Sequence, residues 1–569
     1  MAVKIVYRVL RKISDWALWA FYSEVCIEGE ENVPEDGPLI LSPTHHNEII
    51  DIATLSATVP YRRMISYWAK SSLFSNPVTR AILLSSGSIP VDRRSKDNQR
   101  LFKGTFDSLS IEEAVGIYPE GTSYTEPRIV QVKDGVGWAA LEYLKWAKEK
   151  NFSMKEVVIV PVGIVYTDKS KYQSRVYVKY GKPIFVANYA EQFLPDVDGE
   201  RRAAVKRLCH SVEDGMVSLS VNAPNWDILH CSRLARDLLW GDEKNIPLRQ
   251  FVVVSQTLVD IFSDQNPSPE LVNLKSNLLH YYSLLHYSGL THTSLVGIPL
   301  TFSPRPLRVV FSLMQLTALE IFNLPSYAVP LIVHLPSYIL ASMGARLAKD
   351  EEEARAQYKV VFGGLALAVT YPLFGWNAWK LIRSYKAFKD LVPQRGLFSQ
   401  CIGAAAMAWW LSHWHNRVIE SNYNLYKQYK ATWKVLLGIL SNGLSQSSVQ
   451  PYTIPPPPPI NPFIKRTSST PDPVRKAPPP VPSRRLIHHL LRARVAAYIS
   501  CGVFFQGLER SGELVKPADL GETRVDGTGT SVDVDSVTLS SSTVERSGRE
   551  VVAFLRKNRA DFEGLAKAA

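Results

Sequence analysis

The sequence predicts an α/β domain with a central sheet flanked by helices, then a helical extension, C-terminal membrane helices and a disordered tail. Three observations predict this arrangement. Short apolar runs alternate with helical stretches up to about residue 190, apolar segments without charged residues follow residue 305, and Pro-, Ser- and Thr-rich sequence fills the end. Such alternation is typical of α/β domains, and uncharged apolar segments are typical of membrane helices.

The composition bounds the class of protein without fixing the function. With 569 residues and 63.8 kDa the chain is longer than one ordinary domain. The formal charge of +12 favours an anionic partner, which includes nucleic acid, an anionic membrane surface or a phosphorylated substrate. The five cysteines are scattered without zinc-site or disulfide spacing, which predicts a reducing compartment for the catalytic part.

Residues 1–25 predict an amphipathic basic helix that lies on a membrane. Arg8, Arg11 and Lys12 interrupt the apolar run, so the segment does not resemble a signal peptide. A helix that packs on its own domain is the alternative. The apolar positions at helical spacing are Val6, Val9, Leu10, Ile13, Trp16 and Ala20.

Residues 26–190 predict the α/β domain, and residues 191–304 predict its all-helical extension. The expected strands are 39–41, 116–118, 157–165 and 175–180. The expected helices are 49–58, 77–85, 98–109, 135–150, 201–219, 248–262 and 268–287.

Residues 305–420 predict a transmembrane or re-entrant region. The uncharged apolar segments are 309–319, 326–345, 360–379 and 397–414, and three of them are long enough to cross a bilayer. The prolines at 325, 330 and 336 favour a re-entrant hairpin over 309–345. The basic loop 380–396 indicates the cytosolic side, whereas buried core helices of a soluble domain remain the alternative.

Residues 421–569 predict a mostly disordered tail, because polar, Pro-rich sequence buries too little apolar surface to offset chain entropy. The runs PPPPP and PPPVP fit a plain spacer. An SH3-like partner of these proline runs is the alternative.

His46 and Asp51 form the pattern H-x-x-x-x-D where a predicted strand meets a predicted helix. A histidine near neutral pKa removes a proton from a hydroxyl, and a carboxylate fixes its tautomer and stabilises the imidazolium. No serine or cysteine nucleophile is then required. A helix-capping histidine or a surface pair is the alternative.

Further residues predict a phosphate-bearing substrate. Arg93 follows the apolar turn GSIPVD and has the planar fork that suits phosphate, although a solvated basic turn explains it equally. In GIYPEGTS, Glu120 can accept hydroxyl hydrogen bonds, Gly121 allows a close backbone approach and Thr122 follows them. Lys133 could meet a phosphate, and Pro161 interrupts a buried strand.

These segments resemble the glycerolipid acyltransferase family of glycerol-3-phosphate and lysophosphatidate acyltransferases. The resemblance covers about residues 35–185. It rests on H-x4-D, G-x-I-P-V-D-R at 87–93, Y-P-E-G-T-S at 118–123 and V-P-V at 160–162. The family usually has Asn where this chain has His45, and often has Arg where it has Ser123, which weakens the expected phosphate recognition.

The resemblance implies His46 as general base, Asp51 as its partner, Arg93, Glu120 and Gly121 on a phosphorylated acceptor, and Pro161 on the acyl-CoA side. It implies no metal or bound cofactor, with acyl-CoA as co-substrate. The long chain with apolar segments looks most like fungal-type enzymes that acylate the first carbon of glycerol-3-phosphate or dihydroxyacetone phosphate at the endoplasmic reticulum membrane. The catalytic domain would face the cytosol, and lipid droplets are a further expected location.

Three other functions remain open at this point. One is acylation of lysophosphatidate or phospholipid remodelling, which the motifs do not separate from the first step. Another is a non-catalytic membrane scaffold with a Pro-rich recruitment tail, which has no need for His46, Asp51, Arg93 and Glu120 together. Nucleic-acid binding is disfavoured, because the basic residues are dispersed and no recognition module is evident.

Overall fold

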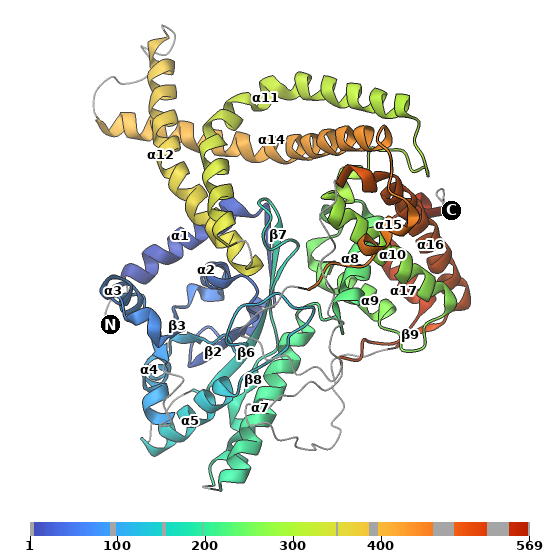
Figure 1. The fold of residues 1–569 in the computed structure, drawn as a ribbon. Helices are drawn as coiled ribbons and strands as arrows, with labels where there is room; N and C mark the ends of the chain where they lie inside the picture. The colour runs from blue at the N-terminus through green and yellow to red at the C-terminus, as the bar shows by residue number, and fades with distance from the viewer. Residues whose placement is uncertain are drawn as a thin grey trace.

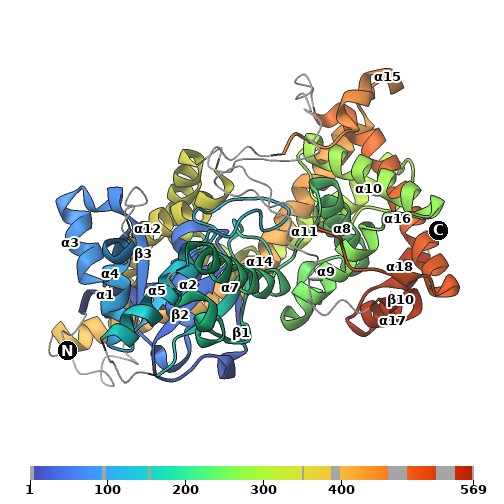
Figure 2. The same cartoon turned by 90° about the horizontal axis from the view of Figure 1, so that it is seen from below.

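The computed structural model describes residues 5–91, 98–150, 155–195, 197–348, 351–385, 397–458, 483–520 and 545–566. An α/β domain forms the N-terminal part, a body of helices lies beside it, and three long helices extend along both (Figure 1; Figure 2). The predicted α/β domain with its helical extension is confirmed.

The central sheet is mixed, with the strand order β1-β7-β6-β2-β5-β3-β4, and β8 pairs with β6. Strand β7 runs antiparallel to β6, whereas β6, β2, β5, β3 and β4 are parallel. Its strands are β1 (Glu24–Glu28), β2 (Leu39–Pro43), β3 (Ile65–Lys70), β4 (Ile89–Val91), β5 (Ala114–Gly116), β6 (Val158–Tyr166), β7 (Arg175–Tyr180) and β8 (Ile184–Phe185). Ligands of such sheets bind where the carboxyl ends of parallel strands meet, and here the loops after β2 and β5 meet.

Helices cover both faces of the sheet because successive residues of β2 point to opposite sides. Ile40 packs in a cluster with one set of helices, and Leu39 and Leu41 pack with the other set. The first set is α4 (Asn98–Ser110), α5 (Gly135–Glu149) and α7 (Asp198–Ser218), and the second is α1 (Ile5–Phe21) and α2 (Glu48–Thr58). Short helices α3 (Pro77–Ser85) and α6 (Ala190–Phe193) complete the domain.

Helix α1 has one buried side and one exposed apolar side. Tyr7 and Leu18 are buried against the domain, whereas the side chains of Trp16 and Trp19 are 65% and 59% exposed. Packing on the domain therefore covers one side of the helix and leaves the apolar side with the two tryptophans exposed.

The helical extension includes part of the chain predicted to be disordered. Helices α8 (Trp226–Trp240), α9 (Phe251–Phe262) and α10 (Pro269–Ser288) share a core with α16 (Ile487–Ser511) and α17 (Gly548–Lys557). The disorder prediction was wrong for these two helices, because Leu490, Cys501 and Phe505 recur at helical spacing and are buried. Smaller elements here are α15 (Gln446–Val449), β9 (Leu514–Val515), β10 (Arg546–Ser547) and α18 (Phe562–Ala566). Most of the Pro-rich and Ser/Thr-rich sequence lies outside the described residues.

The predicted re-entrant hairpin is also wrong. Residues 309–345 lie within one helix, α11 (Pro306–Leu347), which bends but continues through its three internal prolines (Figure 1). It packs on α12 (Arg355–Ser384) and α14 (Leu397–Ile439). Neighbouring helices of this kind can accommodate the backbone groups that proline leaves free.

Two helices among the described residues are long and apolar enough to cross a membrane, by length and composition. They span Pro306–Leu347 and Glu352–Ser384, and only 22% and 17% of their most apolar windows are buried. The predicted segment 397–414 forms the first part of α14 and does not meet the same test. Most of the basic loop 380–396 lies outside the described residues.

Candidate active site

The predicted catalytic motif forms the turn between β2 and α2. Thr44 fixes this turn to the neighbouring strand β6, since its N–H donates to the Val162 carbonyl at 3.0 Å and its hydroxyl oxygen accepts from the Ile164 N–H at 2.9 Å. The Asn47 amide donates to the Lys169 carbonyl at 3.0 Å. The turn is therefore held from two sides.

Asp51 is the centre of the site. Its side chain is fully buried, and its Oδ2 accepts from the main-chain N–H groups of His46 and Asn47 at 2.8 and 2.7 Å. The Tyr166 hydroxyl donates to Oδ1 at 2.7 Å. A carboxylate in the first turn of a helix is also favoured by the helix dipole, so Asp51 is held in one orientation.

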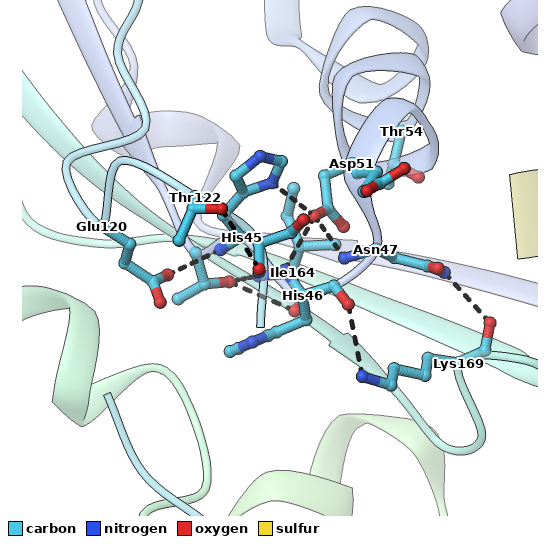
Figure 3. A network of polar contacts seen from close by, with 12 residues as sticks. His45, His46, Asn47, Asp51, Thr54, Glu120, Thr122, Ile164 and Lys169 are labelled. Atoms are coloured by element: carbon cyan, nitrogen blue, oxygen red, sulfur yellow. Dashed lines mark hydrogen bonds and ion pairs between the residues drawn. The ribbon is translucent and has the colours of Figure 1, made fainter. Parts of the chain in front are cut away.

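The imidazole that contacts Asp51 belongs to His45 and not to His46. His45 Nδ1 lies 2.9 Å from Asp51 Oδ2, and its ring packs on Tyr118 with centroids 4.3 Å apart. Figure 3 shows the two imidazoles pointing to opposite sides of the turn. His46 meets Asp51 through its main-chain N–H, so the ring contact expected from the H-x-x-x-x-D spacing is not formed.

The surroundings of His46 disfavour its charged form. Burial lowers the pKa of His46 to about 4, and the nearby charge of Lys169 acts in the same direction, whereas Asp51 opposes both. Lys169 Nζ lies 3.5 Å from the His46 carbonyl oxygen. A ring with this pKa is neutral at pH 7 and is a weak proton acceptor.

Glu120 supports the same turn from the loop after β5. Its side chain is fully buried, and its Oε1 accepts from the His45 N–H at 2.7 Å. Burial raises the pKa of Glu120 to about 7, against the effect of this hydrogen bond. The carboxyl group is thus partly protonated near neutral pH.

The remaining predicted residues fall into three groups. Gly121, with φ +77°, and Lys133 lie together, since a Cβ at Gly121 would be 2.6 Å from Lys133 Nζ. Thr122 is next to them, and its hydroxyl lies 3.5 Å from the Ser123 carbonyl. Pro161 pairs with Ser42 inside the sheet. Arg93 lies outside the described residues.

Pro161 packs inside the domain, because its ring would meet a Cβ placed on Gly215 of α7. It does not line the large cavity described below. The predicted role of Pro161 on the acyl-CoA side stays a prediction.

A cavity of about 2850 Å³ begins at the catalytic turn, where His46, Tyr124 and Thr125 line it. It continues between α8, α10 and the long helices α11, α12 and α14. His45 and Asp51 do not line it. The two adjacent histidines therefore face different surroundings.

The start of α12 and the residues just before it are hydrogen-bonded to α2 and to loops near the turn between β2 and α2. The Thr125 hydroxyl donates to Glu353 Oε2 at 3.0 Å, the Gln357 amide bonds to Glu48 and Lys359 bonds to the Ser170 carbonyl. The long apolar helices and the catalytic turn are thus joined directly.

Among the described residues, no group of three or more His, Cys, Asp or Glu side chains is placed to hold a metal ion. The five cysteines, all of which lie in the described residues, form no disulfide bond.

Sequence reasoning missed three residues of the site: His45, Tyr166 and Lys169. His45 was visible only as a departure from the family pattern. Tyr166 is the last residue of β6 and Lys169 follows this strand, more than a hundred residues from the motif. Only the pairing of β6 with β2 brings them to Asp51 and His46.

The chain is similar in sequence to known acyltransferases. A family model described as Acyltransferase matches residues 24–165. Glycerol-3-phosphate O-acyltransferase 2 of Saccharomyces cerevisiae is 27% identical over 341 residues, which cover 59% of this chain and 42% of the yeast protein. Glycerol-3-phosphate O-acyltransferase 1 of the same organism is 25% identical over 319 residues, or 54% of this chain and 40% of that protein.

Among solved structures, the 1-acyl-sn-glycerophosphate acyltransferase of Thermotoga maritima matches with 19% identity and a TM-score of 0.27, over 37% of this chain and 78% of that one. The chain spans about two fifths of the length of the yeast relatives. The network of His45, Asp51 and Glu120 lies within residues 24–165, the part of the chain that matches the Acyltransferase family model.

Proposed function

We propose that the chain transfers a fatty acyl group from acyl-CoA to the first-carbon hydroxyl of glycerol-3-phosphate, of dihydroxyacetone phosphate, or of both. The observation that carries the proposal is the contact of 2.9 Å between His45 Nδ1 and the buried carboxylate of Asp51. The names of the two yeast relatives support the choice of acceptor.

In this proposal His45 is the general base and Asp51 orients it. The bond from Nδ1 to Asp51 leaves Nε2 of His45 as the nitrogen that accepts the acceptor's hydroxyl proton. The hydroxyl oxygen attacks the thioester carbonyl, and the tetrahedral oxyanion collapses as the CoA thiolate leaves. General-base assistance accounts for about 10² to 10⁴ in rate, so positioning of the two substrates supplies much of the remainder.

The choice of His45 over His46 rests on geometry first. His45 has a carboxylate partner and His46 has the positive charge of Lys169 beside it. A base works best when its pKa is near the working pH, and burial lowers the pKa of His46 to about 4. Arg93, Glu120 and Gly121 are proposed to contact the phosphorylated acceptor, as the family resemblance implies, with Thr122 and Lys133 as further contacts.

Association with a membrane is part of the proposal. It is supported by the exposed Trp16 and Trp19 on α1 and by the two long apolar helices. Tryptophan is enriched at the interface between membrane and water. Location at the endoplasmic reticulum, with the catalytic domain on the cytosolic side, remains a prediction from the resemblance.

The test compares the wild type with His45→Ala and His46→Ala in membranes that contain the full chain. Transfer from labelled acyl-CoA is measured with glycerol-3-phosphate, dihydroxyacetone phosphate and lysophosphatidate side by side. We expect His45→Ala to lose about 10² to 10⁴ in turnover, and His46→Ala to keep most of it.

Three outcomes would contradict parts of the proposal. Loss of transfer in His46→Ala with activity retained in His45→Ala would make His46 the base, as the motif spacing predicts. A preference for lysophosphatidate would move the reaction to the second carbon. No transfer to any of the three acceptors would favour a scaffold or a remodelling enzyme.

A further inference from the structure

Acidic residues are absent from one part of the helical body. Three stretches of the chain, residues 271–319, 421–458 and 483–508, contain ten Lys and Arg residues and no Asp or Glu. Acidic residues are common elsewhere, since the whole chain of 569 residues has 53 of them. The uncharged apolar segment 309–319 explains only a small part of this absence. These stretches are therefore the place to look for an anionic partner.

The three stretches meet in the body of helices. Helix α10 packs on α16, and α14 packs on α16 and on the helical turn Ser483–Leu486 before it (Figure 1). Gly438 of α14 lies directly against Ile487 of α16, and Val309 of α11 shares a core with Val435 of α14. We call the surface at this junction the basic corner. It consists of Lys430 and Lys434 on α14 and Arg484 and Arg485 before α16, with Arg305 and Arg308 beside it at the start of α11.

The cations of the basic corner lie close enough to act on one another. Burial lowers the pKa of Lys434, and the positive charges of Lys430 and Arg484 lower it further. The Lys434 amine donates to the Ser288 carbonyl at the end of α10, and Arg485 Nε donates to the Asn442 carbonyl at 3.4 Å. These main-chain oxygens hold two of the cations in place without neutralising their charge.

Acidic side chains of the packed helices do not balance the basic corner. Glu420 of α14 and Glu509 of α16 pair with other basic residues, and Glu270 lies at the opposite end of α10 from Lys434. Within the described part of the chain, none of the four cations on α14 and before α16 forms an ion pair with a carboxylate. Because like charges repel one another, an anionic surface would make a favourable contact here.

The same end of α14 exposes apolar side chains next to these cations. Lys430, Trp433 and Leu440 recur at helical spacing, which places them on one side of α14. Trp433 and Leu440 are 48% and 66% exposed. Helices that combine lysine with exposed tryptophan and leucine are typical of membrane interfaces. An exposed leucine gains nothing from contact with nucleic acid, whereas it gains from burial among lipid chains.

The start of α11 connects the basic corner to a long apolar helix. Arg305 and Arg308 are exposed there, together with Leu307 and Phe311. The helix that begins at this point is one of the two that are long and apolar enough to cross a membrane. Arginine at the end of such a helix keeps its charged group among the lipid head groups. The basic corner therefore lies where α11 would meet the head groups.

We propose that the basic corner docks on the surface of an anionic bilayer, with Trp433 and Leu440 inserted between the lipids and Lys430, Arg484 and Arg485 against their phosphate groups. This contact is separate from α1 and from the catalytic turn, and it lies outside the residues that match the family model. The inference deepens the membrane association in the proposed function by adding a requirement for anionic lipid. It requires no acyl transfer.

The first experiment places the full chain in phospholipid nanodiscs and measures the surroundings of position 440. Leu440→Cys carries an environment-sensitive nitrobenzoxadiazole label, in a background with Cys26→Ser and Cys401→Ser, because these two cysteines are not buried. We expect brighter, blue-shifted emission in phosphatidylcholine discs with about 30% phosphatidylserine than in phosphatidylcholine alone, and quenching by spin-labelled lipid. Val503→Cys, half exposed on α16, is the control and should give the same emission in both kinds of disc.

The second experiment removes two charges with the double variant Lys430→Gln and Arg484→Gln. Each basic side chain near an anionic surface strengthens binding about fivefold, so the ratio of docked to undocked label at position 440 should fall about twentyfold. Exchanging the two types, with Lys430→Arg and Arg484→Lys, keeps the charge and should restore docking. The matched control is Lys148→Gln with Arg202→Gln, both exposed on the α/β domain, and it should change nothing.

Three results would overturn the inference: equal emission at position 440 in the two kinds of disc, equal shifts at positions 440 and 503, or docking that the double variant leaves unchanged. A single-stranded RNA that shifts the label where phosphatidylserine does not would assign the basic corner to nucleic acid instead. Because no acyl donor is present, these results do not depend on turnover. Lipid-dependent docking in a chain without acyl transfer would refute the proposed function alone, and transfer without such docking would refute the docking surface alone.

Discussion

The buried carboxyl group of Glu120 should make the α/β domain less stable as the pH rises. Glu120 has an ordinary pKa of 4.5 that burial raises to about 7 in the folded chain. The folded state holds this proton more tightly than the unfolded state. The stabilisation that the protonated Glu120 carboxyl gives to the folded state is therefore complete below pH 4.5. It is lost progressively as the pH rises from 4.5 to 7.

The size of the effect follows from the two pKa values. A difference of about 2.5 corresponds to roughly 3 kcal/mol, at about 1.4 kcal/mol for each pH unit. Glu120→Gln resembles the protonated acid and keeps an oxygen for the His45 N–H. Its free energy of unfolding should equal that of the wild type near pH 4.5 and exceed it by up to about 3 kcal/mol above pH 7.

The assay is the thermal midpoint of the purified chain in detergent, followed from pH 4.5 to 8.5. For a domain of this size, 3 kcal/mol corresponds to a shift of about 6–12 °C in the thermal midpoint. The exposed Glu200→Gln on α7 is the control and should show no change with pH. A difference between Glu120→Gln and the wild type that is constant with pH, or that grows toward acid pH, would refute the reasoning.

Two further predictions concern Asp51 and the C-terminal helices. Asp51→Asn removes the charge that faces His45 and three other donors. We therefore expect acyl transfer to fall about 10² to 10⁴-fold, with the circular dichroism spectrum little changed. Unaltered turnover would show that His45 works without this carboxylate. Phe505→Ala on α16 removes a ring that is 1% exposed and should cost about 3–5 kcal/mol, seen as faster limited proteolysis. Val503→Ala, half exposed on the same helix, should cost less than about 0.5 kcal/mol, and equal resistance of the two variants would mean that α16 does not contribute to the core.

Helices and strands with strong local signals were predictable from sequence. The predicted helix 77–85 matches α3, and the predicted strand 175–180 matches β7. Asn76 caps α3, accepting from the N–H groups of Val78 and Thr79, which is a local signal that needs no tertiary structure. Strand β3 was missed, because Ile65–Lys70 contains polar residues and a charged residue and so lacks a clear strand pattern. Its pairing with β5 makes this segment a strand.

The helices of the C-terminal part were not predicted from sequence. Its average composition predicted disorder, yet α16 packs on α10 and α17 packs on α16. The apolar spacing of α16 was present in the sequence, but the proline-rich and serine-rich stretches on either side of it dominated the composition. A window of the length of one helix would have detected it, because Leu490, Cys501 and Phe505 fall on one side of a 3.6-residue repeat.

The catalytic turn explains why spacing alone favoured His46. Consecutive residues in an extended segment point to opposite sides, so two adjacent histidines after β2 cannot both face Asp51. Asp51 Oδ2 binds the main-chain N–H groups of His46 and Asn47, which fixes the turn and leaves the imidazole one residue earlier to reach the same oxygen. The side chain at 46 is then directed into the cavity. One pair of neighbouring residues thus places an imidazole held by a carboxylate on one side of the turn and a neutral ring at the cavity on the other. Exchanging the positions of the two side chains would require the turn itself to change.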